Sequence, residues 1–215
     1  MAVYDLEEQE QISALKAWWE RYGTLVTSLV VAASLASVGW QGWQWYQNRK
    51  AGEAAALYFV VQQAAGSQDA QKARDSAGRL IGDYSGTAYA QLGALLSAGV
   101  QFDSGDLDNA RAQLEWAADK GKDEALRDVA RLRLAAVLLQ KGEYDAALTR
   151  LQAAPAAIAY APRFADLRGD VLAAQGKPAE ARAAYQAAID ALFALGDEAV
   201  TLREVVRVKL ESLEG

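Results

Sequence analysis

The chain contains no cysteine and no histidine. This absence excludes disulfides, thiol and imidazole catalysis, and zinc sites built from those ligands. Only carboxylates, lysine, tyrosine and hydroxyl groups remain for acid–base or nucleophilic chemistry. We therefore expect no enzyme activity, no cofactor, no metal site and no small-molecule substrate. The lack of cysteine does not identify the cellular compartment.

The chain also has few prolines and no excess of basic over acidic residues. The 215 residues include three prolines and carry a net charge of −6, with no basic patch. Nucleic-acid binding depends on neutralising phosphates, so nucleic acid is not an expected partner. Hydrophobic residues make up 52% of the chain and charged residues 23%, which indicates a packed core. Abundant alanine and few β-branched runs predict an all-α fold.

One long segment has no charge at all. The 27 residues between Arg21 and Arg49 include no aspartate, glutamate, lysine or arginine, and the most apolar part is Leu25–Trp45. These 21 residues would rise about 31 Å as a helix, close to the hydrocarbon thickness of a bilayer. We predict a single transmembrane helix over residues 23–46. A signal peptide is the alternative, but the acidic segment that precedes this run favours an uncleaved anchor.

Tryptophan gathers on both sides of this segment. Amphipathic indole rings favour the headgroup level of a membrane, so these residues are predicted to lie at the two interfaces. They are Trp18, Trp19, Trp40, Trp43 and Trp45. Two basic residues flank each end of the segment, so the positive-inside rule leaves its orientation open.

The segment before the span, residues 1–22, has an apolar face. Ile12, Leu15, Trp19 and Tyr22 recur at helical spacing, while acidic residues occupy much of the remainder. We predict an amphipathic helical tail that lies along the membrane surface or extends the span.

A glycine-based pattern repeats after the span. Gly105, Gly142 and Gly176 are separated by 37 and then 34 residues, and the second interval is the period of the tetratricopeptide repeat, a pair of antiparallel helices. Glycine would end the first helix in a left-handed conformation, and small residues would allow the two helices to approach closely. The predicted packing residues are Ala98, Gly105, Ala110, Ala135, Gly142, Ala147, Gly169, Gly176 and Ala181.

The pattern resembles the tetratricopeptide family only in part. The aromatic residue that the family usually places early in the first helix is replaced by Ala94, Arg131 and Ala165. Residues 51–88 lack the motif and are expected to form an atypical first repeat. A last helix that includes Val206 and Lys209 should cover the end of the stack. The whole of residues 47–215 is therefore predicted to be a tetratricopeptide-like α-solenoid.

The family register implies a concave, partner-binding face. The residues that it places there are Leu95, Phe102, Leu132, Leu139, Arg163, Asp166 and Asp170. The alternative is that flanking helices cover these residues and make them part of the core. Asp166 and Asp170, one helical turn apart, could mimic an acid–base or metal pair. A local charge network with Arg163 explains them more simply.

Several short segments together resemble one family across nearly the whole chain. They are Met1 to Tyr4, Ala14-Leu15-Lys16, Trp18-Trp19, Gly39-Trp40 and Ala165-Asp166-Leu167-Arg168-Gly169. The chain resembles the bacterial inner-membrane proteins described as ancillary subunits of the SecYEG translocon (YfgM-like).

This resemblance implies a topology and partners that the spacing of residues does not supply. It implies a cytoplasmic N-terminus, one span in the inner membrane and a periplasmic repeat domain. It also implies a protein–protein interaction module that associates with the SecYEG translocon and links translocated proteins to periplasmic chaperones. A membrane-anchored assembly or signalling scaffold unrelated to export is the alternative function.

Overall fold

The computed structural model describes residues 2–196 and 199–213, and among these residues it contains helices and no strand. The predicted all-α class is confirmed. The side chains of residues 1–7 and 9 lie outside the described part, and with them the side chains of the Met1–Tyr4 segment and of part of the predicted tail. The chain divides into two compact units, residues 1–50 and residues 51–215, each described here by itself.

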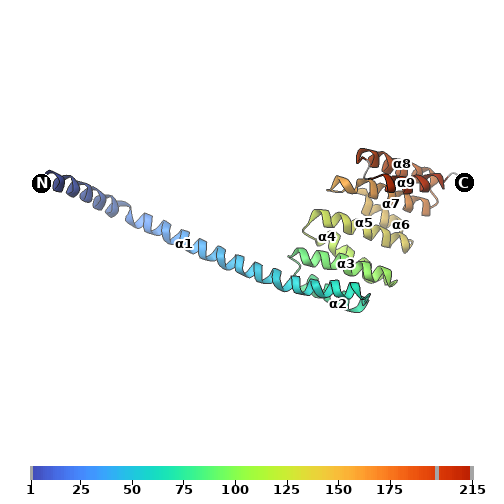
Figure 1. Ribbon diagram of the computed structural model, residues 1–215, viewed down its shortest axis with the longest axis horizontal. Coiled ribbons are helices and arrows are strands. Elements are labelled where there is room, and N and C mark those ends of the chain that lie inside the picture. Colours follow the sequence, from blue (N-terminus) through green and yellow to red (C-terminus); the bar gives the residue numbers. More distant parts are fainter. Residues whose placement is uncertain (1, 197–198, 214–215) are drawn as a thin grey trace. The chain divides into compact units, whose positions relative to one another are not determined.

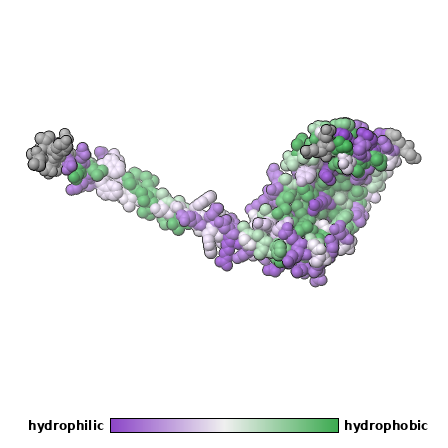
Figure 2. Space-filling view, in the orientation of Figure 1, coloured by the Kyte–Doolittle hydropathy of each residue, from purple (hydrophilic) through white to green (hydrophobic). Residues whose placement is uncertain are grey.

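The first unit is a single run of helix with exposed apolar side chains. It belongs to α1 (Ala2–Gly66), so both predicted boundaries, after residues 22 and 46, fall inside one continuous helix. Within Glu10–Gly66, α1 is long and apolar enough to cross a membrane, and only 6% of its most apolar stretch is buried. Figure 2 shows hydrophobic residues gathered in the middle of this run, between more hydrophilic stretches.

The tryptophans predicted at the membrane interfaces lie on the surface of the first unit. Their exposed fractions range from 47% at Trp18 to 69% at Trp40. Trp19 lies against Gly23, where an added Cβ would come within 3.1 Å of the indole ring. Arg49 lies over the ring of Trp45 at 5.8 Å, which is a favourable cation–π distance.

The second unit is a stack of helical hairpins. The last part of α1 pairs with α2 (Ala70–Asp83), α3 (Ala88–Asp103) with α4 (Leu107–Lys120), and α5 (Glu124–Gln140) with α6 (Tyr144–Gln152). A short 3₁₀ helix, η1 (Ile158–Tyr160), precedes α7 (Ala161–Ala174), which pairs with α8 (Pro178–Ala194). The last helix, α9 (Val200–Glu211), packs on α8. Figure 1 shows these helices side by side, as expected for a tetratricopeptide-like solenoid.

The three repeated glycines make the same turn. Gly105, Gly142 and Gly176 have φ values of 81°, 73° and 73°, in the left-handed region where a Cβ would be strained. At the first of them, the Gly105 N–H donates to the Phe102 carbonyl and the Asp106 N–H donates to the Gln101 carbonyl. This pair of bonds is the Schellman motif, and equivalent bonds occur at the other two glycines.

A fourth turn of this kind contains glutamine in place of glycine. Gln68 has a φ of 54°, its N–H donates to the Ala65 carbonyl, and the Asp69 N–H donates to the Ala64 carbonyl. Asp69 then caps α2 by accepting a hydrogen bond from the Lys72 N–H at 3.0 Å. The end of α1 and α2 therefore form a first hairpin in phase with the others. The repeat was hidden in the sequence because its marker glycine is absent.

The small residues predicted at the helix crossings lie in the core. Ala98, Ala110, Ala135, Ala147 and Ala181 are each at most 1% exposed. Gly169 is also buried, and a Cβ there would come within 2.4 Å of the Tyr185 ring. Helices that cross at such points can approach closely only while the side chain stays small.

One glutamine fixes the connection between the second and third hairpins. Gln91 of α3 is 2% exposed, and its Nε2 donates to the carbonyls of Ala117 and Asp123. The Asp123 N–H donates back to Gln91 Oε1 at 3.1 Å. A Cβ on Gly121 would come within 2.1 Å of Gln91 Nε2, so this turn needs glycine for the close approach.

The connection between α6 and α7 is held by a buried ion pair. Asp128 of α5 is 2% exposed, is paired with Arg131, and accepts a hydrogen bond from the Ala157 N–H. Arg131 also donates to the carbonyls of Ala153 and Ala154. The linker from residue 153 to residue 157 is thus ordered although it is not helical.

Candidate functional site: a groove between α1, α3 and α5

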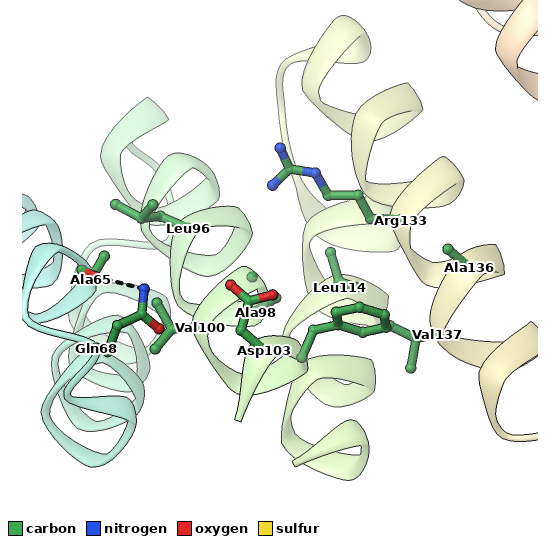
Figure 3. A pocket seen from close by; sticks show the side chains of 12 residues that line it. Ala65, Gln68, Leu96, Ala98, Val100, Asp103, Leu114, Arg133, Ala136 and Val137 are labelled. Atoms are coloured by element: carbon green, nitrogen blue, oxygen red, sulfur yellow. Dashed lines mark hydrogen bonds between the residues drawn. The ribbon is translucent and has the colours of Figure 1, made fainter. Parts of the chain in front are cut away.

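A cavity of about 460 Å³ opens between the end of α1, α3 and α5. Figure 3 shows side chains from these helices around the space, together with Leu114 of α4. The lining residues are Ala65, Gln68, Leu96, Ala98, Gly99, Val100, Phe102, Asp103, Leu114, Arg133, Ala136 and Val137. We call this space the groove. It is mostly apolar, with a few polar side chains that can orient a bound molecule.

Small residues form part of the wall of the groove. Gly99 lies inside α3, and an added Cβ there would meet no heavy atom within 4 Å outside its own helix neighbourhood. Glycine inside a helix costs roughly 0.5–1 kcal/mol relative to alanine. No internal contact explains this glycine. Ala136 of α5, which lines the same space, is also small.

Gln68, which also lines the groove, has a strained backbone conformation that lowers local stability. It has a left-handed backbone at the position where the other three turns have glycine. A non-glycine residue in this conformation costs about 1 kcal/mol or more. Its side chain donates a long hydrogen bond of 3.4 Å to the Ala65 carbonyl, the contact drawn in Figure 3.

Opposite charges lie on two helices that line the groove. Asp103 is an exposed residue at the end of α3, and Arg133 extends from α5. The Arg133 Nη1 donates to the Leu95 carbonyl at 3.1 Å, which holds the guanidinium beside α3. The remaining guanidinium N–H groups can donate to a bound molecule, and Asp103 can accept from one.

The structure brings only part of the predicted concave face into the groove. Phe102 lines it, whereas Leu95 is 5% exposed and lies in the core. Leu132 and Leu139 are half-buried against the same core and are not among the residues that line the groove. Leu95 therefore lies in the core, as expected if neighbouring helices cover this position.

Sequence reasoning missed several groove residues. Leu96 follows Leu95, and Gly99 lies one helical turn from both Leu95 and Phe102, the two residues of this helix that the family register placed on this face. The available signal was Gly99 itself, a glycine inside an alanine-rich helix. No sequence pattern indicated Gln68, because its turn does not have the glycine that marks the others.

The three charged residues at the last repeat form a different arrangement. Arg163 is exposed on α7. Asp166 and Asp170 both accept from the Nζ of Lys209, at 2.8 and 2.9 Å, and Asp170 also accepts from the Tyr185 hydroxyl at 2.8 Å. Their ion-pair partner is thus Lys209 of α9 rather than Arg163.

Burial and pairing change the acidity of this cluster. Burial raises the pKa of Asp166, although Lys209 opposes this effect. Burial alone would lower the pKa of Lys209, but the hydrogen bonds from its ammonium to Asp166 and Asp170 raise it above the ordinary value. Burial and the hydrogen bond to Asp170 raise the pKa of Tyr185. A half-buried cluster whose charges satisfy one another is typical of a structural ion-pair network.

The residues described contain no group of three or more histidine, cysteine, aspartate or glutamate side chains that could hold a metal ion. Asp166 and Asp170 are already engaged by Lys209 and Tyr185. The groove is therefore the candidate site, and its chemistry is that of a binding surface.

Comparison with known proteins places the chain in a family. The model of the tetratricopeptide repeat-like domain matches residues 16–215. An ancillary SecYEG translocon subunit of Neisseria gonorrhoeae is 32% identical over 213 residues, which cover 97% of this chain and 98% of that protein. A protein of the same name from Escherichia coli K12 is 30% identical, with 99% of each chain covered.

A third relative, from Haemophilus influenzae, has the same name and is 30% identical over 86% of this chain and 90% of its own length. No solved structure gives a significant match. With its tetratricopeptide repeat-like domain and these near full-length similarities, the chain belongs to the family of ancillary SecYEG translocon subunits.

Proposed function

We propose that this protein is a membrane-anchored adaptor of the Sec translocon that holds a segment of a partner protein in the groove between α1, α3 and α5. The names of its relatives support the association with the translocon. The apolar run of α1 supports the anchor. In this proposal the protein acts by binding and catalyses no reaction.

One observation carries the proposal: two residues that each cost local stability line the same cavity. Gln68 has a backbone conformation that favours glycine, and Gly99 lies in a helix where alanine would be better. Packing explains neither choice. Both become favourable if the groove must present the Gln68 amide and leave space above Gly99 for the backbone of a partner.

The groove suits a polypeptide segment. Phe102, Leu96 and Val100 provide apolar contacts, and Asp103 and Arg133 can pair with charges of opposite sign at its edge. An amphipathic helix in an apolar groove is a common form of peptide recognition, and an aromatic anchor usually supplies much of the binding energy. We expect the occupant to have an apolar face flanked by charges of both signs.

The test uses two matched glycine substitutions. Gly99→Leu fills the groove, whereas Gly78→Leu changes an exposed glycine inside α2 that also has open space around it. Both should stabilise the helix by up to about 1 kcal/mol. We expect only Gly99→Leu to reduce co-purification of translocon components from membranes, by about tenfold. Equal co-purification with both variants would contradict a role for the groove.

The finer part of the proposal concerns export. By resemblance to the family, the N-terminus is cytoplasmic, the repeats are periplasmic, and the groove links translocated proteins to periplasmic chaperones. A reporter fused after Gly215 that is active only in the periplasm tests this topology. A cytoplasmic reporter would remove the chaperone role and leave the adaptor role standing.

A scaffold unrelated to export is the second candidate, because the repeat unit alone would suit any partner protein. Site-specific photo-crosslinking from Ala136, which lines the groove, separates the two functions. Capture of translocon subunits or of chains in transit supports the export function. Capture of only regulatory or respiratory proteins supports the scaffold.

A further inference from the structure

The third hairpin has an unusually short second helix. α6 spans 9 residues, whereas α2 and α4 span 14 each and α8 spans 17. The chain leaves the helix after Gln152 and continues through the ordered linker to η1 and α7.

A cleft of about 530 Å³ lies at this place, separate from the groove. Leu151, Phe164 and Leu172 are buried at its base, and alanines of the linker, α7 and α8 form much of its walls. The cleft is preformed, because the ion pair of Asp128 and Arg131 fixes the linker that borders it.

An apolar side chain projects from η1, directly after the linker. Ile158 lies between Pro155 and Ala161, which both line the cleft, and it is 82% exposed, the highest value among the large exposed hydrophobic side chains described. Each molecule thus presents an apolar projection beside an apolar cleft. An apolar projection three residues from the wall of an apolar cleft is a pairing that a self-complementary, twofold interface can use.

The charges at the cleft have the same self-complementary property. Arg168 of α7 and Glu180 of α8 both line it and are exposed. In a twofold pair, Arg168 of each molecule could face Glu180 of the other, so that two ion pairs form together. Another protein would need to supply both charges and an apolar projection.

We propose that two copies of this chain associate through this face, with Ile158 of each copy seated in the cleft of the other. The interface is small, so the association is weak in solution. It becomes effective when both copies are confined to one membrane, where the local concentration is high. The proposal does not depend on the groove or on its partner.

Reversal of the two charges gives a test that a change in folding cannot mimic. Arg168→Glu and Glu180→Arg each replace both attractive pairs with like-charge contacts, so each variant alone should associate about tenfold less than the original chain. A mixture of the two variants restores both pairs, but only between unlike copies. We therefore expect association to return in the mixture, as heterodimers.

The measurement exploits the absence of native cysteine. Full-length copies with two different tags are placed together in lipid vesicles, one carrying Ile158→Cys and the other Ala183→Cys in the cleft. A short bis-maleimide should join them more efficiently than it joins Ala183→Cys to Ala112→Cys on the exposed part of α4. Equal yields for both pairs, or no recovery in the charge-reversal mixture, would overturn the proposal.

Discussion

The two ends of the helical array use the same positions in opposite ways. At α3 and α5, the inward-facing positions hold Gly99 and Ala136 and leave an open groove. At α7, the position that corresponds to these two holds Asp170, which together with Asp166 is closed over by Lys209 of α9. The inward-facing side of α3 and α5 is therefore open to a partner, whereas the corresponding side of α7 is already covered by α9 of the same chain.

The two ends of the array also contain buried or groove-lining glycines that have different structural roles. Gly169 is small because the Tyr185 ring occupies the space where a Cβ would stand, whereas Gly99 has nothing in that space. In one case the small residue serves folding, and in the other it leaves room for a partner. Substitution at each position tests the distinction directly.

The largest effect is expected for Gly169→Ala. The added methyl group would lie 2.4 Å from the Tyr185 ring, whose hydroxyl is also bonded to Asp170 and so cannot move freely. We expect a loss of about 3 kcal/mol in the free energy of unfolding. The measurement is urea unfolding of the full chain in detergent, monitored by circular dichroism. Gly99→Ala is the matched control and should gain up to about 1 kcal/mol. A loss at both positions would erase the contrast between the two glycines.

Lys209→Ala should have the next largest effect. It leaves two half-buried carboxylates, Asp166 and Asp170, without their cation, and we expect a loss of about 2 kcal/mol. Arg207→Ala on the same helix removes only an exposed pair with Glu204 and should cost less than about 1 kcal/mol. If both variants lose the same stability, α9 does not depend on this cluster.

The pH dependence of the same ion pair has a definite sign. The pKa of Lys209 is raised in the folded chain, so its stabilisation is complete below the ordinary lysine value of about 10.4 and is lost as the pH rises further. The difference in melting temperature between the original chain and Lys209→Ala should therefore shrink above about pH 10.4. A difference that stays constant to higher pH would assign the effect of the substitution to packing.

A smaller effect is expected where α4 begins. Asp106 accepts from the Asn109 N–H and side-chain amide, which lowers its pKa, and Asp106→Ala should cost about 1 kcal/mol. This contribution should be present above the ordinary aspartate pKa and should disappear as the pH falls below it. The residue that caps the start of α8, Lys177, makes no side-chain hydrogen bond to the helix, so Lys177→Asp should instead stabilise the chain. Thermal unfolding at neutral and acidic pH checks both variants.

The smallest effect is expected at the first turn. Gln68→Gly removes the left-handed strain that the other three turns avoid, so it should stabilise the chain by somewhat less than about 1 kcal/mol. The same change should weaken partner binding in the groove if the Gln68 side chain contacts the partner. A variant that gains stability and binds equally well would leave the glutamine without a role in recognition.

Sequence patterns predicted the repeats because each turn and each helix crossing favours a particular residue type. A left-handed residue at the end of a helix selects glycine, and a close crossing selects alanine, so Gly105, Gly142 and Gly176 revealed three hairpins. The first hairpin was not recognised as regular because Gln68 meets the same demand at a cost. The early end of α6 was missed as well, since a buried ion pair from α5 stabilises the linker that follows it.

The groove was less predictable than the fold. The family register placed Leu95, Leu132 and Leu139 at its surface, but small differences in helix rotation decide which side chain faces in and which faces out. The partner of Asp166 could not be read from nearby residues either, because Lys209 lies 43 positions away and reaches it only after α9 has docked. Long-range pairs of this kind depend on the packed structure.

The clamp made by Gln91 has a consequence for the thermodynamics of recognition. This buried amide forms hydrogen bonds to both ends of the connection between α4 and α5. It therefore fixes the position of the third hairpin relative to the second. The groove is lined by residues of both hairpins, so the distance between its α3 and α5 walls is already fixed before a ligand binds. The loss of conformational entropy on association then falls mainly on the guest, and differences in affinity among guests should follow how ordered each one is beforehand.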